Sequence, residues 1–195
     1  MKRLSVQVSR CFSTWKTNDG GVILKTSEST QIESVGSDKL THVDSDGRAK
    51  MVDVGRKPES RRNAVASGIV ILGAQAFRLV KENKIKKGDV LVIAQLAGIM
   101  AAKATATLIP LCHNIPIFNI QVDLQLDEES YAVHICASVD TIGRTGAEME
   151  SLTAVTAAAL TVYDMCKAVS RDIVISDIKL MRKSGGKSED FIRKI

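Results

Sequence analysis

The chain has 195 residues, of which 45% are hydrophobic and 4% aromatic, and its formal net charge at pH 7 is +5. This length suffices for one domain with a real core, and the longest apolar runs are too short to span a bilayer. The first 18 residues hold four basic residues and no acid, which leaves a net charge of +1 for the rest. A nearly neutral remainder argues against a nucleic-acid-binding surface.

The N-terminal segment predicts a targeting sequence followed by a linker. Residues 1–18 combine basic residues and serines with spaced apolar side chains, a composition typical of mitochondrial presequences. Residues 19–39 are polar and rich in Gly and Ser without sustained periodicity, which predicts a flexible linker. We therefore expect a folded domain over residues 40–195 and a location in the mitochondrial matrix. A disordered basic N-terminus on a cytoplasmic protein is the alternative.

The first half of the expected domain predicts one strand and two helices. Residues 61–72 favour a strand, although a helix remains an alternative, and residues 73–83 favour a short helix. Residues 89–108 are rich in alanine and predict a second helix, which Pro110 would end.

The second half predicts a hairpin, a long helix and a last strand. Residues 115–126 and 131–141 flank an acidic turn and favour two antiparallel strands. Residues 147–168 predict a long helix, and residues 172–181 a strand that precedes a polar tail. Few strands mixed with helices indicate an α+β fold in which helices cover one face of a mostly antiparallel sheet.

The long helix 147–168 carries charge only near its ends, since no charged residue lies between Glu150 and Asp164. Such a helix suits burial on most sides. Asp164 and Lys167 share a face, whereas Glu148 and Lys167 lie roughly 28 Å apart. Antiparallel packing of this helix on a second copy would join its two ends, so we expect a composite site between subunits. Stabilisation of the helix dipole is the alternative, but it does not explain Asp164.

Four further patterns bear on possible binding sites. The run SGGKS at 184–188 lacks the first glycine of a P-loop, but its glycines and the flanking lysines could bind an anion; a soluble tail is the alternative. The Cys and His residues at 112, 113, 134 and 136 lack the usual spacing of zinc ligands, so we expect no metal site. His113 lies in a predicted loop, where binding residues concentrate, and Lys87 precedes a helix start, which favours a nearby anion.

Several longer motifs, spread from about Leu40 to Phe191, resemble one family in order and spacing. They are KMVDVGRK, KKGDV, LAGIMAAK, LIPLCH, TGAEMESLTAVTAAALTVYDMCKAV and KSGGKSEDF. The family is the molybdenum cofactor biosynthesis protein C family, the cyclic pyranopterin monophosphate synthases. The resemblance implies a ferredoxin-like fold and a hexamer of dimers with active sites between subunits. It also implies a lyase that converts (8S)-3′,8-cyclo-7,8-dihydroguanosine 5′-triphosphate to cyclic pyranopterin monophosphate and pyrophosphate.

The same resemblance implies roles for individual residues. Asp164, Lys167 and Lys87 correspond to catalytic acid–base groups. The expected substrate-binding residues are Leu111, Cys112, His113, Glu148, Met149, Glu150, Asp53, Arg62, Lys183 and Lys187. No resident cofactor is implied, with Mg²⁺ left open, and the expected functional link is to the radical-SAM GTP cyclase of the pathway. The chain departs from the pattern at Asn114-Ile115, where bacterial members carry Pro-Leu, and at Arg144, where lysine is common.

Two other classes of function compete with this interpretation. A non-catalytic nucleotide-binding or scaffold protein of the same fold would have lost the acid–base group, yet Asp164, Lys167 and Lys87 are all present. A nucleic-acid-binding α+β module would carry a basic surface with interleaved aromatic residues, which this sequence lacks.

Overall fold

The computed structural model of this chain describes residues 48–187 and 189–194. The expected presequence, linker and domain start at residue 40 therefore lie outside the described residues. The elements below belong to the unit that begins at Met51. Across these described ranges, no helix has the length and apolar character needed to cross a membrane.

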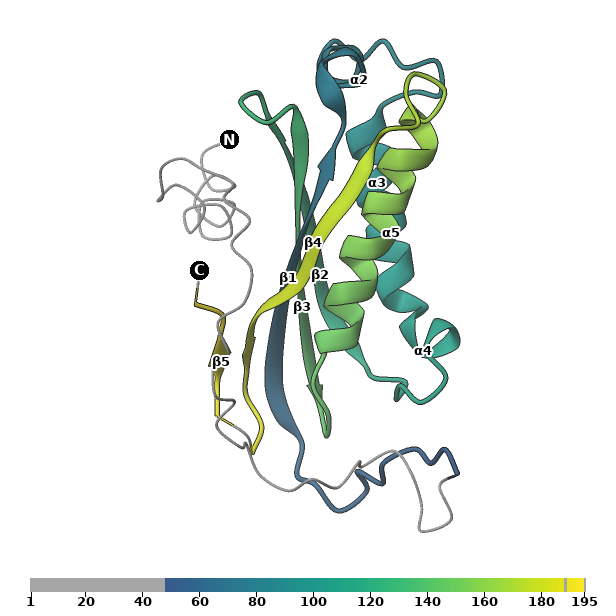
Figure 1. Ribbon diagram of the computed structural model, residues 1–195. Helices are drawn as coiled ribbons and strands as arrows, with labels where there is room; N and C mark the ends of the chain where they lie inside the picture. Colours follow the sequence, from purple (N-terminus) through teal and green to yellow (C-terminus); the bar gives the residue numbers. More distant parts are fainter. Residues whose placement is uncertain (1–47, 188, 195) are drawn as a thin grey trace. The chain divides into compact units, whose positions relative to one another are not determined.

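Five strands within the described residues, 48–187 and 189–194, form a single sheet in which each neighbouring pair is antiparallel. The strand order is β2-β3-β1-β4-β5, and Figure 1 shows the helices on one face of this sheet. A β-α-β-β-α-β succession with this order defines the ferredoxin-like arrangement, so the predicted α+β fold class is confirmed. The strands are β1 (Ser60–Ile71), β2 (Ile117–Asp127), β3 (Ala132–Gly143), β4 (Val174–Ser184) and β5 (Phe191–Ile192).

The described residues form four helices, and the two long ones, α3 and α5, run side by side along the sheet (Figure 1). The predicted single helix over residues 89–108 is wrong in one respect, because it divides after Lys103. The hydroxyl of Thr105 donates to the carbonyls of Ala101 and Ala102, which competes with the regular helical bonding pattern. The helices are α2 (Gly73–Lys81), α3 (Val90–Lys103), α4 (Thr105–Leu108) and α5 (Glu148–Cys166).

Glycines let the helical layer approach the sheet and the two long helices approach each other. A Cβ on Gly98 of α3 would lie 2.9 Å from the Ala154 carbonyl oxygen of α5. A Cβ on Gly68 of β1 would lie 2.7 Å from Cγ1 of Val155. The apolar core between the layers is therefore thin, and α5 is held at a fixed height above β1.

In the part of the chain that the structure describes, the outer side of α5 is apolar and exposed. Leu160 is 57% exposed, and a shallow groove runs along the helix beside α4. Among the described residues, the buried side of the helix is the one that faces α3 and the sheet, and packing of the outer side on a second copy stays a prediction. The groove is lined by Leu108, Ile109, Met149, Leu152, Thr153, Thr156, Ala157 and Leu160.

The C-terminal segment is more ordered than a soluble tail. Strand β4 continues to Ser184, and the chain turns back so that Lys183 pairs with Phe191 of β5. Gly185 and Gly186 make this turn with φ values of 86° and 94°, which residues with a side chain adopt only at a cost. The alternative of a soluble tail is therefore wrong for residues 184–187, and Lys183 pairs with Ala64 of β1.

Candidate functional site

Three charged side chains meet at the C-terminal end of α5. One carboxylate oxygen of Asp164 lies 2.6 Å from Nζ of Lys167, and the other lies 2.7 Å from Nζ of Lys87. Lys87 also donates to the backbone carbonyl of Asp164 at 2.8 Å. Lys87 comes from the loop before α3, where the Asp89 side chain caps the helix by accepting from Leu91 N and Val92 N. The three predicted acid–base residues are therefore in direct contact.

This lysine–aspartate–lysine contact shifts the pKa values of Asp164 and Lys167. Hydrogen bonds from Lys167 and then from Lys87 lower the pKa of Asp164 to about 2. The hydrogen bond to Asp164 in turn raises the pKa of Lys167. At neutral pH the arrangement thus holds a carboxylate between ammonium groups, and each ammonium can donate a proton or bind a phosphate oxygen. The neighbouring thiol of Cys166 stays protonated, since burial raises its pKa to about 11.

A second group of predicted residues lies at the N-terminal end of α5. The carboxylate of Glu148 lies 3.4 Å from Nζ of Lys183 on β4. Gly146 permits this orientation, because a Cβ at that position would overlap the Glu148 carboxylate. Met149 points toward the apolar groove, which it helps to line, so the first turn of α5 presents both a charged and an apolar side chain.

Glu150 is the buried acid of this second group. Glu150 is only 3% exposed. Sγ of Cys112 lies 3.8 Å from Oε1 of Glu150. Oε2 has no hydrogen-bond partner in the part of the chain that the structure describes. Burial raises the pKa of Glu150 and also that of Cys112, whose thiol faces the carboxyl. A buried carboxyl with one unused oxygen is suited to a polar ligand group that reaches this pocket.

His113 and Leu111 follow α4 in the same loop as Cys112. Nε2 of His113 lies 2.8 Å from the carbonyl oxygen of Val52, so this side chain holds the segment that carries Asp53. Leu111 is half-buried in that loop. Two predicted parts of the site that are distant in the sequence are therefore in contact, namely residues 52–53 and 111–113.

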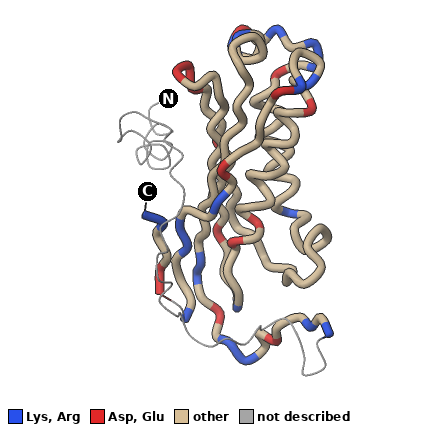
Figure 2. Tube along the Cα trace, viewed as in Figure 1, with Lys and Arg blue, Asp and Glu red and all other residues tan. Residues whose placement is uncertain are grey.

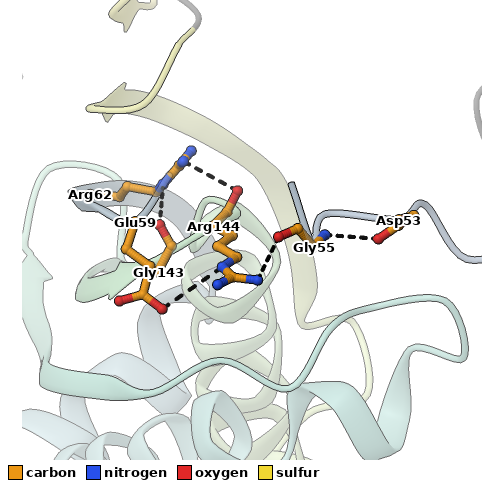
Figure 3. Close-up of polar contacts among 6 residues, drawn as sticks. All are labelled: Asp53, Gly55, Glu59, Arg62, Gly143 and Arg144. Carbon is orange, nitrogen blue, oxygen red and sulfur yellow. Dashed lines mark hydrogen bonds and ion pairs between the residues drawn. The ribbon is translucent and has the colours of Figure 1, made fainter. Parts of the chain in front are cut away.

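Arg62 connects β1 to the loop before α5. Its guanidinium donates to the Gly143 carbonyl at 3.1 Å and to the Arg144 carbonyl at 3.2 Å. Both bonds are drawn in Figure 3. Gly186 packs against the same guanidinium, with no room for a Cβ, so the turn that carries Lys187 lies beside Arg62. Arg62 and Lys183 thus come from the neighbouring inner strands β1 and β4, and Lys187 comes from the turn after β4.

The predicted site residues consequently form two groups at opposite ends of α5, and one chain does not bring them together. Figure 2 shows charged residues at both ends of this helix and none along its middle. Over residues 48–187 and 189–194, no three His, Cys, Asp or Glu side chains are arranged to hold a metal ion. Arg144 contacts Gly55 and Glu59, and the sequence patterns did not predict these contacts. The one feature of the sequence that could have indicated them is a basic residue inside a loop bounded by glycines.

The sequence of this chain matches one family model and several known proteins. The family model described as MoaC family matches residues 51–186. Molybdenum cofactor biosynthesis protein 1 of Homo sapiens is 61% identical over 157 residues, which are 80% of this chain and 25% of that protein. Cyclic pyranopterin monophosphate synthase of Clostridium acetobutylicum is 52% identical over 157 residues, 80% of this chain and 98% of that protein. The chain therefore spans about a quarter of the human relative and nearly all of the bacterial one.

Proposed function

Because the chain belongs to the MoaC family, we propose that it is a lyase of molybdenum cofactor biosynthesis. Its proposed reaction converts (8S)-3′,8-cyclo-7,8-dihydroguanosine 5′-triphosphate to cyclic pyranopterin monophosphate with release of pyrophosphate. The observation that carries the proposal is the Asp164 carboxylate held between Lys87 and Lys167. We further propose a functional link to the radical-SAM GTP cyclase that would supply this substrate.

The chemistry of the substrate fits the charges of both groups. A triphosphate carries about four negative charges, which Lys and Arg donors pair most strongly. Lys183 and Arg62 offer such donors near the N-terminal end of α5. Rearranging the purine-derived ring and closing the cyclic phosphate both require proton transfers, and a positioned acid–base group contributes about 10²–10⁴-fold to such a step. In this proposal Lys167 and Lys87 move those protons, and Asp164 orients both amines.

The two groups would meet in an oligomer. The apolar outer side of α5 supports packing of this helix, antiparallel, on the same helix of a second copy. That packing would place the Asp164 end of one copy beside the Glu148 end of the other, so each site would draw on two chains. We propose a homo-oligomer on this basis, with a hexamer of dimers as its full form.

The catalytic proposal is tested by pyrophosphate release from the cyclo-dihydroguanosine triphosphate. Asp164→Asn should reduce turnover by about 10²–10⁴-fold, because it removes the charge that orients both lysines while preserving the shape of the side chain. The matched control is Asp177→Asn, since Asp177 makes an equally short ion pair with Lys179, 2.6 Å, on β4. Near-normal turnover of Asp164→Asn would remove Asp164 from the mechanism. Parallel assays in EDTA and with added Mg²⁺ test the proposed absence of a resident cofactor.

The assembly is tested by sizing the protein in solution. Leu160→Glu places a charge on the uncovered side of α5, so it should dissociate the oligomer and abolish turnover while the far-UV circular dichroism spectrum stays unchanged. Ile192→Glu on β5 is the control, because Ile192 is at least as exposed but lies away from the groove. A monomeric protein with full activity would contradict the composite site.

We also propose that residues 1–39 direct a domain of residues 40–195 to the mitochondrial matrix. The family match begins at residue 51, which supports a role for the N-terminal segment outside the enzyme domain. Fusion of residues 1–39 to a fluorescent protein should yield a mitochondrial signal, and replacing the four basic residues of residues 1–18 with glutamine should abolish that signal. A cytoplasmic signal from the unaltered fusion would refute the assignment.

A further inference from the structure

The segment of residues 52–59 leads into β1 without forming a helix or strand of its own. In the part of the chain that the structure describes, the side chains that tie it to the rest of the domain are His113 and Arg144. His113 contacts the carbonyl of Val52, and Arg144 contacts Gly55 and Glu59. An irregular exposed segment keeps one conformation only where such contacts offset its conformational entropy.

Arg144 links this segment to Arg62 through a continuous series of hydrogen bonds (Figure 3). Arg62 donates to the Arg144 carbonyl, and Nη1 of Arg144 donates to the Gly55 carbonyl at 2.7 Å. The Gly55 amide then donates to Oδ1 of Asp53 at 2.8 Å. The Arg144 guanidinium also lies 3.8 Å from the Glu59 carboxylate, so one planar group holds two points of the segment.

We infer that Arg144 is a positioning residue that acts on the substrate site through Asp53. This inference rests on the proposed function, in which Asp53 and Arg62 bind the substrate. By fixing Gly55, Arg144 fixes the residue whose amide orients the Asp53 carboxylate. A site organised before the substrate arrives loses less freedom on binding, which favours affinity and correct placement.

The geometry also predicts the effect of a lysine at position 144. A lysine ammonium is a point donor, whereas the guanidinium offers several donors in one plane. Arg144→Lys could therefore keep the bond to the Gly55 carbonyl but not the contact with Glu59 at the same time. Its effect should lie between those of the wild type and Arg144→Ala.

A double-mutant cycle separates positioning from direct phosphate binding. Arg144→Ala and Asp53→Ala should each lower kcat/KM by about 10–100-fold, the scale expected when a binding group is misplaced by about an ångström. If Arg144 acts through Asp53, the double variant should be no worse than Asp53→Ala alone. Multiplication of the two losses would overturn the inference, as would an Arg144→Lys variant that is as poor as Arg144→Ala.

A second measurement needs no substrate. Trypsin should cleave after Arg56 several-fold faster in Arg144→Ala than in the wild type, because the segment is released, and mass spectrometry identifies the cut. Arg78→Ala, which removes an exposed arginine from α2, is the matched control and should leave this rate unchanged. An unchanged rate in Arg144→Ala would refute the tether. An inactive wild type would instead refute the proposed function and leave the proteolysis result standing.

Discussion

Replacement of Gly68 by alanine tests the close contact between β1 and α5 that holds the helix above the sheet. The new Cβ would lie 2.7 Å from Cγ1 of Val155 and 3.1 Å from Cγ1 of Ile178. Favourable contacts between carbon atoms occur at about 3.5–4.0 Å, so the methyl group is roughly 1 Å too close to Val155. Gly68→Ala should therefore destabilise the domain although it adds only one methyl group.

The magnitude follows from two opposing effects. Overpacking of a filled core costs about 1–3 kcal/mol, whereas alanine in a strand gains about 0.5–1 kcal/mol over glycine from the unfolded state. The free energy of unfolding should thus fall by about 0.5–2 kcal/mol. For a domain of this size, that corresponds to a fall in melting temperature of roughly 1–8 °C.

The assay is urea unfolding followed by circular dichroism at fixed protein concentration, since assembly would make stability depend on concentration. Val155→Ala removes the opposing methyl group, so the double variant should be more stable than the sum of the single effects by about 1 kcal/mol. Gly143→Ala in β3 is the control, because its Cβ would meet its nearest neighbour at 3.6 Å. Full additivity, or a stabilised Gly68→Ala, would refute the reasoning.

Two further predictions concern single side chains. Asp89→Ala removes the cap of α3, so it should lower the free energy of unfolding by about 1 kcal/mol, as measured by urea unfolding. Asp89→Asn should retain most of the stability that the cap contributes, and equal losses in both variants would contradict a capping role. Burial raises the pKa of Glu150, so the folded state binds its proton more tightly than the unfolded state, and stability should fall as pH rises from the ordinary glutamate range through the raised pKa. Glu150→Gln should lose that part of the pH dependence, and unfolding curves between pH 4 and 8 that run parallel for both proteins would argue against it.

Much of the fold follows from local patterns, and the misses have local causes. The hairpin of β2 and β3 and the helix α5 could be placed from alternation and helical periodicity. The division between α3 and α4 could not, because residues 104–108 contain no Gly or Pro to mark a break, whereas the Thr105 hydroxyl competes for carbonyls. Strand β5 was missed because two residues pair only after the glycine turn has brought them to β4.

Some contacts of the candidate site could likewise be predicted from the sequence, and others could not. The spacing of Asp164 and Lys167 places them on one helix face, and the structure shows that contact at 2.6 Å. Lys87 lies 77 positions from Asp164, so family resemblance, and no spacing rule, indicated its role. The bond from Arg144 to the Gly55 carbonyl joins residues 89 positions apart through backbone, which leaves no residue-type pattern in the sequence.

The separation of the two charged groups by the length of α5 has a genetic consequence in the proposed assembly. If each site takes one end of the helix from each of two chains, an allele altered at Asp164 and an allele altered at Glu148 would each be null alone. Expressed together, they would form mixed pairs that contain one intact site and one doubly defective site. Random pairing would restore roughly a quarter of the sites, so two loss-of-function alleles would complement each other within one gene.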